Sequence, residues 1–267
     1  MGVRMPMKMR KTFTAVRKIL FRYGSLFLIL LLWETVSRSG MMNPVLLPAV
    51  SKIAVRFFEL LFFGKLSYHI GQSMLRMWIG LGLATLVGIP LGILMARFGV
   101  ARSLLEPLLS LGFPIPKIAI YPGLIIFFGV LHSSKIALIF IEATFPIVMA
   151  TFHGALLVEH KLIWSAESMG TEKRKMLWKV IFPMTLPHIF TGFRLGLIVS
   201  LIVVFLAEMI ASAEGLGHLM MASSRVFKST DMFVAIGTIS CLGFLFDRIL
   251  LSLRRKALRW HPEAASN

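Results

Sequence analysis

Residues 77–96 read MWIGLGLATLVGIPLGILMA and contain no charged side chain. A helix needs about 20 mostly apolar residues to cross the hydrocarbon core of a bilayer, and this run has that length. The composition agrees, because 57% of the chain is hydrophobic, above the roughly 45–50% apolar content of soluble domains. The chain is therefore expected to be a membrane protein, and the lack of strand-like alternation favours helices over a barrel.

Five further apolar runs approach the spanning length, although each carries isolated ionisable residues; they are 21–38, 106–131, 136–157, 189–211 and 232–253. Together with 77–96 they predict an all-α polytopic fold with about six transmembrane helices in a single transmembrane domain, 1–267. A shorter segment, 50–63, has the spacing of an amphipathic helix at the membrane surface.

The basic residues predict the orientation. With an inside amino terminus, eighteen Lys and Arg residues fall in cytoplasmic segments and six in external loops. Cytoplasmic loops collect Lys and Arg, so both termini are expected inside. The cytoplasmic parts are then the basic N-terminus 1–20, the loop 158–188 and the tail 254–267. The net charge of +17 suits the anionic leaflet, and it requires no nucleic-acid partner.

The third predicted span, 106–131, contains Pro114, Pro116 and Pro122. Each proline removes a backbone donor and bends or breaks a helix. Non-helical backbone at membrane depth occurs where it is buried in protein or lines a wet cavity. Two interpretations stay open, a simple proline kink and a break that lines a transport path.

Two GxxxG patterns, Gly88 with Gly92 and Gly192 with Gly196, lie within predicted spans. Such patterns let helix backbones approach closely. They indicate a bundle with tight helix contacts, either within the chain or with a second copy.

The stretch SAESMGTEKRKMLWKVIFPMTLP, residues 165–187, is unusually charged for its surroundings. Its apolar spacing predicts two short helices joined at Gly170, which stands where a left-handed C-cap belongs. Pro183 and Pro187 are expected to end the second helix before the fifth span. Trp164, Trp178 and the basic cluster 173–175 suit docking to a protein and contact with the membrane interface equally well.

The same stretch resembles the loop of ABC importer membrane subunits that carries the pattern EAA, then glycine, then I-x-P. Ser165 and Ala166 precede Gly170, and Ile181-Phe182-Pro183 follows it. The chain resembles in particular permeases of the nitrate/sulfonate/taurine type, through FPIPKIAIYPGLIIFFG (113–129), FPIVMATFHG (145–154), LAEMIASAEGLGHLM (206–220) and LRWHP (258–262). The resemblance covers roughly residues 70–262 and implies a fold like that of type I ABC importer permeases.

This resemblance implies that the loop couples the chain to a separate ATPase subunit, through Trp164, Ser165, Ala166, Glu167, Ser168, Met169, Gly170, Thr171 and Glu172. One position departs from the family pattern, because Trp164 stands where the glutamate is usual. Glu167 lies three residues further along and shares its helical face, so it is the candidate substitute.

The resemblance also implies the partners: a second permease copy, two ATP-binding subunits inside, and an extracytoplasmic solute-binding protein, all at the inner membrane. ATP and Mg would be bound by the partner subunit, and no cofactor is expected in this chain. The chain has no GxxxxGK[ST] loop, so ATP coupling would come from elsewhere. Sulfonates, taurine, nitrate and vitamin precursors are the substrates that the family carries.

Ionisable residues and prolines within the spans are candidates for the translocation path: Pro114, Pro116, Lys117, Glu142, Arg194 and Glu208. Interhelical pairing or snorkelling is the competing explanation for Lys117 and Arg194. Glu208 resembles the acid of the family's fifth-helix AE pattern and is expected to stabilise an outer gate, while Arg76 is expected to be structural. The segment 214–219 is interpreted either as a flexible loop or as a contact to the binding protein.

Two other classes of function are weighed against an importer subunit. An ion-coupled secondary transporter or channel would use the acids Glu142 and Glu208 and would need no ATPase. A membrane enzyme that acts on lipid would need a clustered catalytic set, but the chain has no HExxH or GxSxG pattern. No catalytic residue, metal site or disulfide is therefore expected, and the single cysteine, Cys241, is interpreted as a core residue.

Overall fold

The computed structural model describes residues 24–43 and 45–260, and these residues form helices and connections without a β-strand. In chain order the elements are α2 (Val50–Phe62), α3 (Leu66–Arg97), α4 (Gly99–Gly112), the 3-10 turn η1 (Lys117–Ile120), α5 (Tyr121–Phe128), α6 (His132–Leu156), α7 (His160–Ser168), α8 (Lys173–Met176), the π-helical segment η2 (Leu177–Ile181), α9 (Phe182–Ile210), α10 (Leu216–Arg225) and α11 (Ser229–Ala257). Residues 24–38 are also helical. The predicted all-α class is confirmed.

Four helical stretches are long and apolar enough to cross a membrane: α3, α6, the continuous stretch Leu177–Ile210, and α11. They contain or overlap the predicted spans 77–96, 136–157, 189–211 and 232–253, and each begins earlier than the sequence indicated. The stretch from α4 to α5 makes a fifth span if it is counted as one. The expected first span, 21–38, begins outside the described residues.

The helix α6 packs closely against both α3 and α9, which contact each other much less. The main hydrophobic core joins these helices through Leu81, Ile147 and Val204, all fully buried. Both GxxxG patterns face α6: a Cβ on Gly88 would lie 2.8 Å from Ile147 Cγ2, and one on Gly196 would lie 3.0 Å from Ile147 Cδ1. The close contacts predicted from these glycines are therefore made within the chain.

The third predicted span is broken. The helix α4 ends at Gly112, and its axis makes an angle of 89° with the η1–α5 segment. Pro114 and Pro116 occupy the exposed connection, and Pro122 lies in the first turn of α5, where no intrahelical N–H partner is lost. Of the two interpretations left open by the sequence, the simple kink is wrong.

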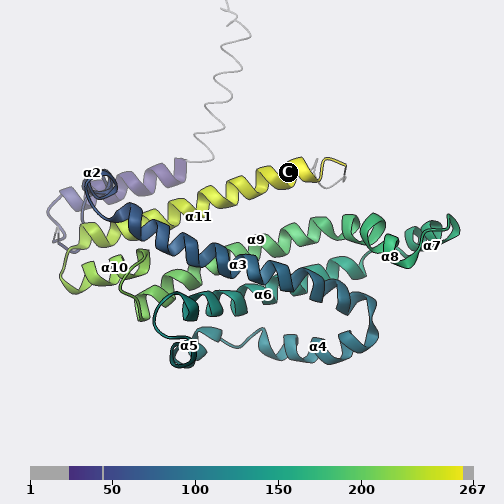
Figure 1. The fold of residues 1–267 in the computed structure, drawn as a ribbon. Helices are drawn as coiled ribbons and strands as arrows, with labels where there is room; N and C mark the ends of the chain where they lie inside the picture. The colour runs from purple at the N-terminus through teal and green to yellow at the C-terminus, as the bar shows by residue number, and fades with distance from the viewer. Residues whose placement is uncertain (1–23, 44, 261–267) are drawn as a thin grey trace, which may run out of the picture.

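The long helices separate two ends of the bundle (Figure 1). One end carries the C-termini of α3, α6 and α11 together with α7 and α8, and the other carries α2, α5 and α10. The predicted surface helix 50–63 is α2, and none of its residues is buried.

Candidate functional site

The charged stretch forms a helical projection at one end of the bundle (Figure 1), and we call α7, α8 and η2, residues 160–181, the elbow. Gly170 has a φ of +76°, its N–H donates to Glu167 O at 2.9 Å, and Thr171 N–H donates to Ala166 O at 3.0 Å. This pair of bonds around a left-handed residue is a Schellman turn. The glycine C-cap predicted from the sequence is confirmed.

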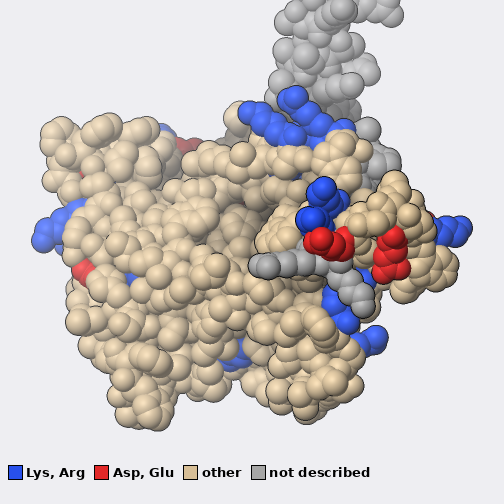
Figure 2. All heavy atoms as spheres, turned by 45° about the vertical axis from the view of Figure 1, so that its right-hand side comes forward, with Lys and Arg blue, Asp and Glu red and all other residues tan. Residues whose placement is uncertain are grey.

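A small core of its own holds the elbow together. Ala166, Met176 and Ile181 are each at most 5% exposed, and they join α7 to α8 and η2. Other large apolar side chains remain exposed on the elbow: Leu162 (39%), Trp164 (63%), Met169 (75%) and Trp178 (63%). Figure 2 shows charged side chains gathered at this end of the molecule, while the flanks of the bundle are mostly uncharged. Exposed apolar side chains framed by polar ones are typical of an interaction surface.

The elbow is continuous with the next span, contrary to the expected helix end. The backbone stays helical from Lys173 to Ile210 through η2, whose π-type bond runs from Phe182 N–H to Leu177 O. A proline within a helix clashes with the carbonyl of the preceding turn, and a widened π turn directly before Pro183 relieves that contact. Pro187 is likewise inside α9.

A cavity of about 720 Å³ separates the elbow from the end of α3. Arg97 and Glu167 are the charged residues in its lining, and the buried Nε and Nη2 atoms of Arg97 have no hydrogen-bond partner. Glu167, the candidate substitute for the family glutamate, is exposed at the rim of this cavity. The elbow therefore contacts the bundle loosely on this side. The side chains of 173 and 174, from the basic cluster, lie outside the described part.

At the opposite end of the bundle, Arg76 of α3 and Glu208 of α9 form a buried ion pair. Arg76 Nη1 lies 2.6 Å from Glu208 Oε1, and both residues are 1% exposed. Ser73 Oγ and Gly217 N–H donate to the other carboxylate oxygen of Glu208, at 2.7 and 3.1 Å. A buried charge is stable only when it is paired and hydrogen-bonded, and both conditions are met here.

The connection between α9 and α10 completes this network. Arg76 Nη2 lies 2.6 Å from Glu214 Oε1, and Tyr68 donates a hydrogen bond to the other oxygen of the same carboxylate. The hydrogen bond from Tyr68, with the charge of Arg76, lowers the pKa of Glu214 below its usual range. Gly215 has a φ of +106°, and a Cβ there would lie 2.2 Å from Glu208 Cδ. The flexible-loop interpretation of 214–219 is therefore wrong, since this segment is packed over the ion pair and continues into α10.

Two more ion pairs lie within the spans. Lys117, at the break in the third span, approaches Glu142 Oε2 to 3.8 Å and lies 4.1 Å above the Phe145 ring. Arg194 Nε lies 2.6 Å from Asp247 Oδ1, which joins α9 to α11. The structure thus places both basic residues in interhelical pairs, and no hydrogen bond or ion pair between described residues joins these pairs to the Glu208 network.

The sequence alone did not identify the partners of Glu208. Ser73 and Arg76 lie 135 and 132 positions from Glu208 in the chain, and only Gly217 is a local partner. One signal was available, because Arg76 directly precedes the uncharged run 77–96. An arginine at the border of an apolar run is usually interpreted as a side chain that snorkels to the membrane interface. In the structure, α3 instead begins ten residues before Arg76 and buries this side chain.

Comparisons with known proteins agree with this geometry. Residues 88–259 match the family described as binding-protein-dependent transport system inner membrane component. The chain is 33% identical over 253 residues to the taurine transport system permease protein TauC of Escherichia coli K12, covering 92% of each chain. It is 31% identical over 232 residues to the putative aliphatic sulfonates transport permease protein SsuC of Bacillus subtilis 168, covering 87% of this chain and 84% of that one. The fold resembles a chain of the inward-facing MetNI methionine ABC transporter, with a TM-score of 0.63 at 17% identity over 72% of this chain and 95% of that one.

Proposed function

This chain belongs to the binding-protein-dependent transport system inner membrane components, the permeases of ABC importers, and from that premise we propose how it works. It forms one transmembrane domain, 1–267, that carries a small solute across the inner membrane, and a separate subunit hydrolyses ATP. The ATPase subunit binds the elbow at residues 164–172. Both termini and the elbow face the cytoplasm, as the distribution of basic residues favours.

The exposed apolar surface of the elbow carries this proposal. Trp164 and Met169 project from a unit that has its own buried core, so they are available to a partner without unfolding the elbow. Tryptophan in such a position is typical of the few residues that dominate a protein interface. Glu167 is exposed beside them and supplies the acid that the family pattern requires at this contact.

The continuous helix from the elbow to Glu208 suggests how a push is transmitted. When ATP closes the partner subunits, displacement of the elbow moves α9 as one body, because α8, η2 and α9 are joined without a break. The far end of α9 holds the Arg76–Glu208 pair. That pair closes the outer end in the present state, and tilting of α9 would open it in an alternating-access cycle.

The assembly proposed is a homodimer of this chain with two ATP-binding subunits, which bind ATP and Mg, and a solute-binding protein on the other side. The path is assigned to the region around Pro114, Pro116, Lys117, Glu142 and Arg194, with Glu208 at its outer gate. A sulfonate such as taurine is the proposed substrate, since similar permeases are named for taurine and aliphatic sulfonates. A sulfonate would suit a path that contains Lys117 and Arg194.

Capture of an ATP-binding subunit tests the proposal. The full chain is solubilised in detergent with a candidate ATP-binding subunit, and Trp164→Ala, Met169→Ala and Glu167→Ala are compared with Phe63→Ala, an exposed apolar residue (92%) at the opposite end. Truncation of a tryptophan that dominates an interface costs about 2 kcal/mol or more, or roughly thirtyfold in affinity. Equal capture by Trp164→Ala and Phe63→Ala would contradict docking at the elbow. Solute uptake by the chain without an ATPase would instead favour the ion-coupled alternative.

A further inference from the structure

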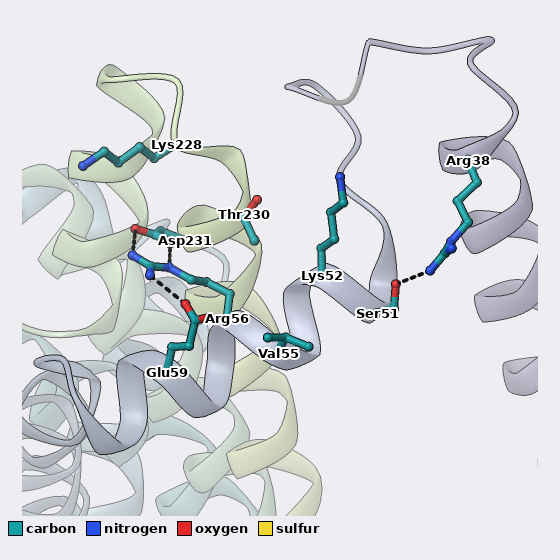
Figure 3. A pocket seen from close by; sticks show the side chains of 9 residues that line it. All are labelled: Arg38, Ser51, Lys52, Val55, Arg56, Glu59, Lys228, Thr230 and Asp231. Atoms are coloured by element: carbon teal, nitrogen blue, oxygen red, sulfur yellow. Dashed lines mark hydrogen bonds and ion pairs between the residues drawn. The ribbon is translucent and has the colours of Figure 1, made fainter.

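A charged cavity lies at the end of the bundle opposite the elbow. It measures about 660 Å³ and opens between α2 and the start of α11 (Figure 3). Four cationic and two anionic side chains line it: Arg38, Lys52, Arg56, Lys228, Glu59 and Asp231. Its lining is therefore positive, and the proposed transport function uses none of these residues.

Ion pairs neutralise only part of this charge. Arg56 Nε lies 2.6 Å from Asp231 Oδ1, and its Nη1 lies 2.9 Å from Glu59 Oε2. The hydrogen bond with Asp231, followed by that with Glu59, raises the pKa of Arg56 and keeps it charged. Arg38 is paired as well, since its Nε lies 2.6 Å from Glu34 Oε1. Lys52 and Lys228 form no ion pair with any residue that the structure describes. With Glu34 counted, four cationic and three anionic side chains meet at the cavity, which leaves one net positive charge.

Two helix N-termini border the cavity, and acidic side chains offset their partial positive charge. Lys52 lies in the first turn of α2 and Lys228 is the N-cap of α11, and no side chain of either N-cap residue caps its helix. Helix N-termini carry a partial positive charge, but each of these two already has an acid. Ser51 N–H donates to Glu34 Oε2 at 3.1 Å, and Asp231 lies in the first turn of α11. In Figure 3 both N-termini border the cavity, the Lys52 amine extends away from α2, and the Lys228 amine lies beyond Asp231. The two unpaired lysines, and not the helix ends, therefore favour an anion at this cavity.

The neighbouring surface of α2 is apolar and exposed. Phe58 and Phe62 stack with their ring centroids 6.4 Å apart and are 56% and 71% exposed, and Val55 is 60% exposed at the edge of the cavity. The core-facing side of the same helix is separate, since it packs through Ile53 and Phe57. A helix that presents basic residues and exposed aromatic residues on adjoining faces lies in the plane of a membrane interface.

We propose that this cavity binds the phosphate of an anionic phospholipid from the leaflet opposite the elbow. Lys52, beside the apolar strip of α2, contacts the phosphate oxygens, Lys228 adds to the positive charge at the cavity, and the acyl chains lie along Val55, Phe58 and Phe62. The headgroup of an anionic phospholipid and a soluble phosphate ester both present a phosphate group to such a cavity. The apolar strip directly beside the basic cavity favours the lipid, because a soluble ester has nothing to place there.

The test is binding of phosphatidylglycerol to the detergent-solubilised full chain, followed by native mass spectrometry with phosphatidylcholine as the reference lipid. Lys52→Gln and Lys228→Gln are each expected to weaken binding about fivefold, since a lysine near an anionic lipid surface contributes about 1 kcal/mol. Lys65→Gln is the matched control, a lysine at the same end that does not line the cavity. Lys52→Arg keeps the positive charge, so it is expected to bind phosphatidylglycerol about as tightly as the wild type does.

Three results would overturn the proposal. The first is binding of phosphatidylglycerol by the Lys52→Gln/Lys228→Gln double variant as tightly as by the wild type. The second is an equal loss in Lys65→Gln. The third is displacement of the lipid by sn-glycerol 3-phosphate at equal concentration, which would assign the cavity to a soluble phosphate ester. The measurement needs neither an ATPase nor transport, so its failure is distinguishable from failure of the proposed function.

Discussion

Arg76 and Glu208 approach to 2.6 Å between Nη1 and Oε1 at the end of the bundle opposite the elbow, although 132 positions separate them in the chain. The pair joins α3 to α9 on either side of α6, and the connection after α9 folds back over it. It is thus the point where the last turn of α9 is fixed to the rest of the bundle.

Removing one member of this pair should destabilise the protein strongly. Glu208→Ala leaves Arg76 buried without its partner, and breaking a buried pair costs about 3–5 kcal/mol. The expected result is a large fall in the thermal midpoint of the detergent-solubilised protein. The double variant Arg76→Leu/Glu208→Leu should recover part of the loss, because it leaves no uncompensated charge. A thermal midpoint of Glu208→Ala close to that of the wild type would contradict this account of the pair.

Gly215 should tolerate no side chain. Its φ of +106° strains any L-residue, and a Cβ would meet the Glu208 carboxylate at 2.2 Å. Gly215→Ala is therefore expected to lower stability by at least about 1–3 kcal/mol. Gly237→Ala is the control, since a Cβ on Gly237 would meet nothing within 4 Å and alanine favours a helix. Similar unfolding curves for the two variants would show that the connection is looser than described.

The membrane class and the main spans could be predicted because hydropathy acts locally and over long windows. The beginnings of the helices could not, since a polar residue such as Arg76 is accommodated by a distant partner that a window does not see. Arg76 is stabilised by Glu208, which lies on another helix. For this reason α3 begins at Leu66 although the apolar run begins at 77.

In the elbow, too, one feature could be predicted from the sequence and another could not. Its Schellman turn was predictable because Gly170 and its bonding partners are all within five residues. The continuation through Pro183 was not, because the π turn that accommodates this proline is a detail of backbone geometry that no residue pattern specifies. The break at Pro114 and Pro116 was recognised as irregular, but the sequence could not distinguish a kink from an 89° turn.

Gly92 should be sensitive to the smallest enlargement. A Cβ at this position would lie 2.7 Å from Thr151 Cβ and 2.8 Å from the backbone O of Val148, which cannot move aside without shifting α6. Overpacking of this kind costs about 1–3 kcal/mol. Gly92→Ala should therefore unfold at a lower temperature than Gly82→Ala, on the same helix, whose Cβ would meet nothing within 4 Å. The reverse order would contradict the packing of α3 on α6.

Stability should depend on the ionisation of Glu214. The hydrogen bond from Tyr68, with the charge of Arg76, holds the pKa of this carboxyl below its usual value of 4.5. A carboxyl with a lowered folded-state pKa stabilises the protein above the unfolded-state pKa, and this contribution is lost as the pH falls through the folded-state value. The difference in thermal midpoint between wild type and Glu214→Gln should therefore be constant above about pH 5.5 and shrink below about pH 4.5. A difference that does not change with pH would contradict this assignment.

An exchange of charges can separate a structural role of Arg194 from a role in the path. Arg194 Nε lies 2.6 Å from Asp247 Oδ1, and the arginine side chain remains 42% exposed, so it is able both to hold α11 and to attract an anion. Arg194→Asp alone places two acids together, and both stability and solute uptake by the reconstituted transporter should fall. The double variant Arg194→Asp/Asp247→Arg restores an ion pair with the charges reversed.

If the pair only joins two helices, the double variant should regain both stability and uptake. If Arg194 contacts the solute, stability should return while uptake stays low, because the positive charge now lies on the other helix. Recovery of neither property would show that the geometry of this pair, and not its charge, is what the bundle requires.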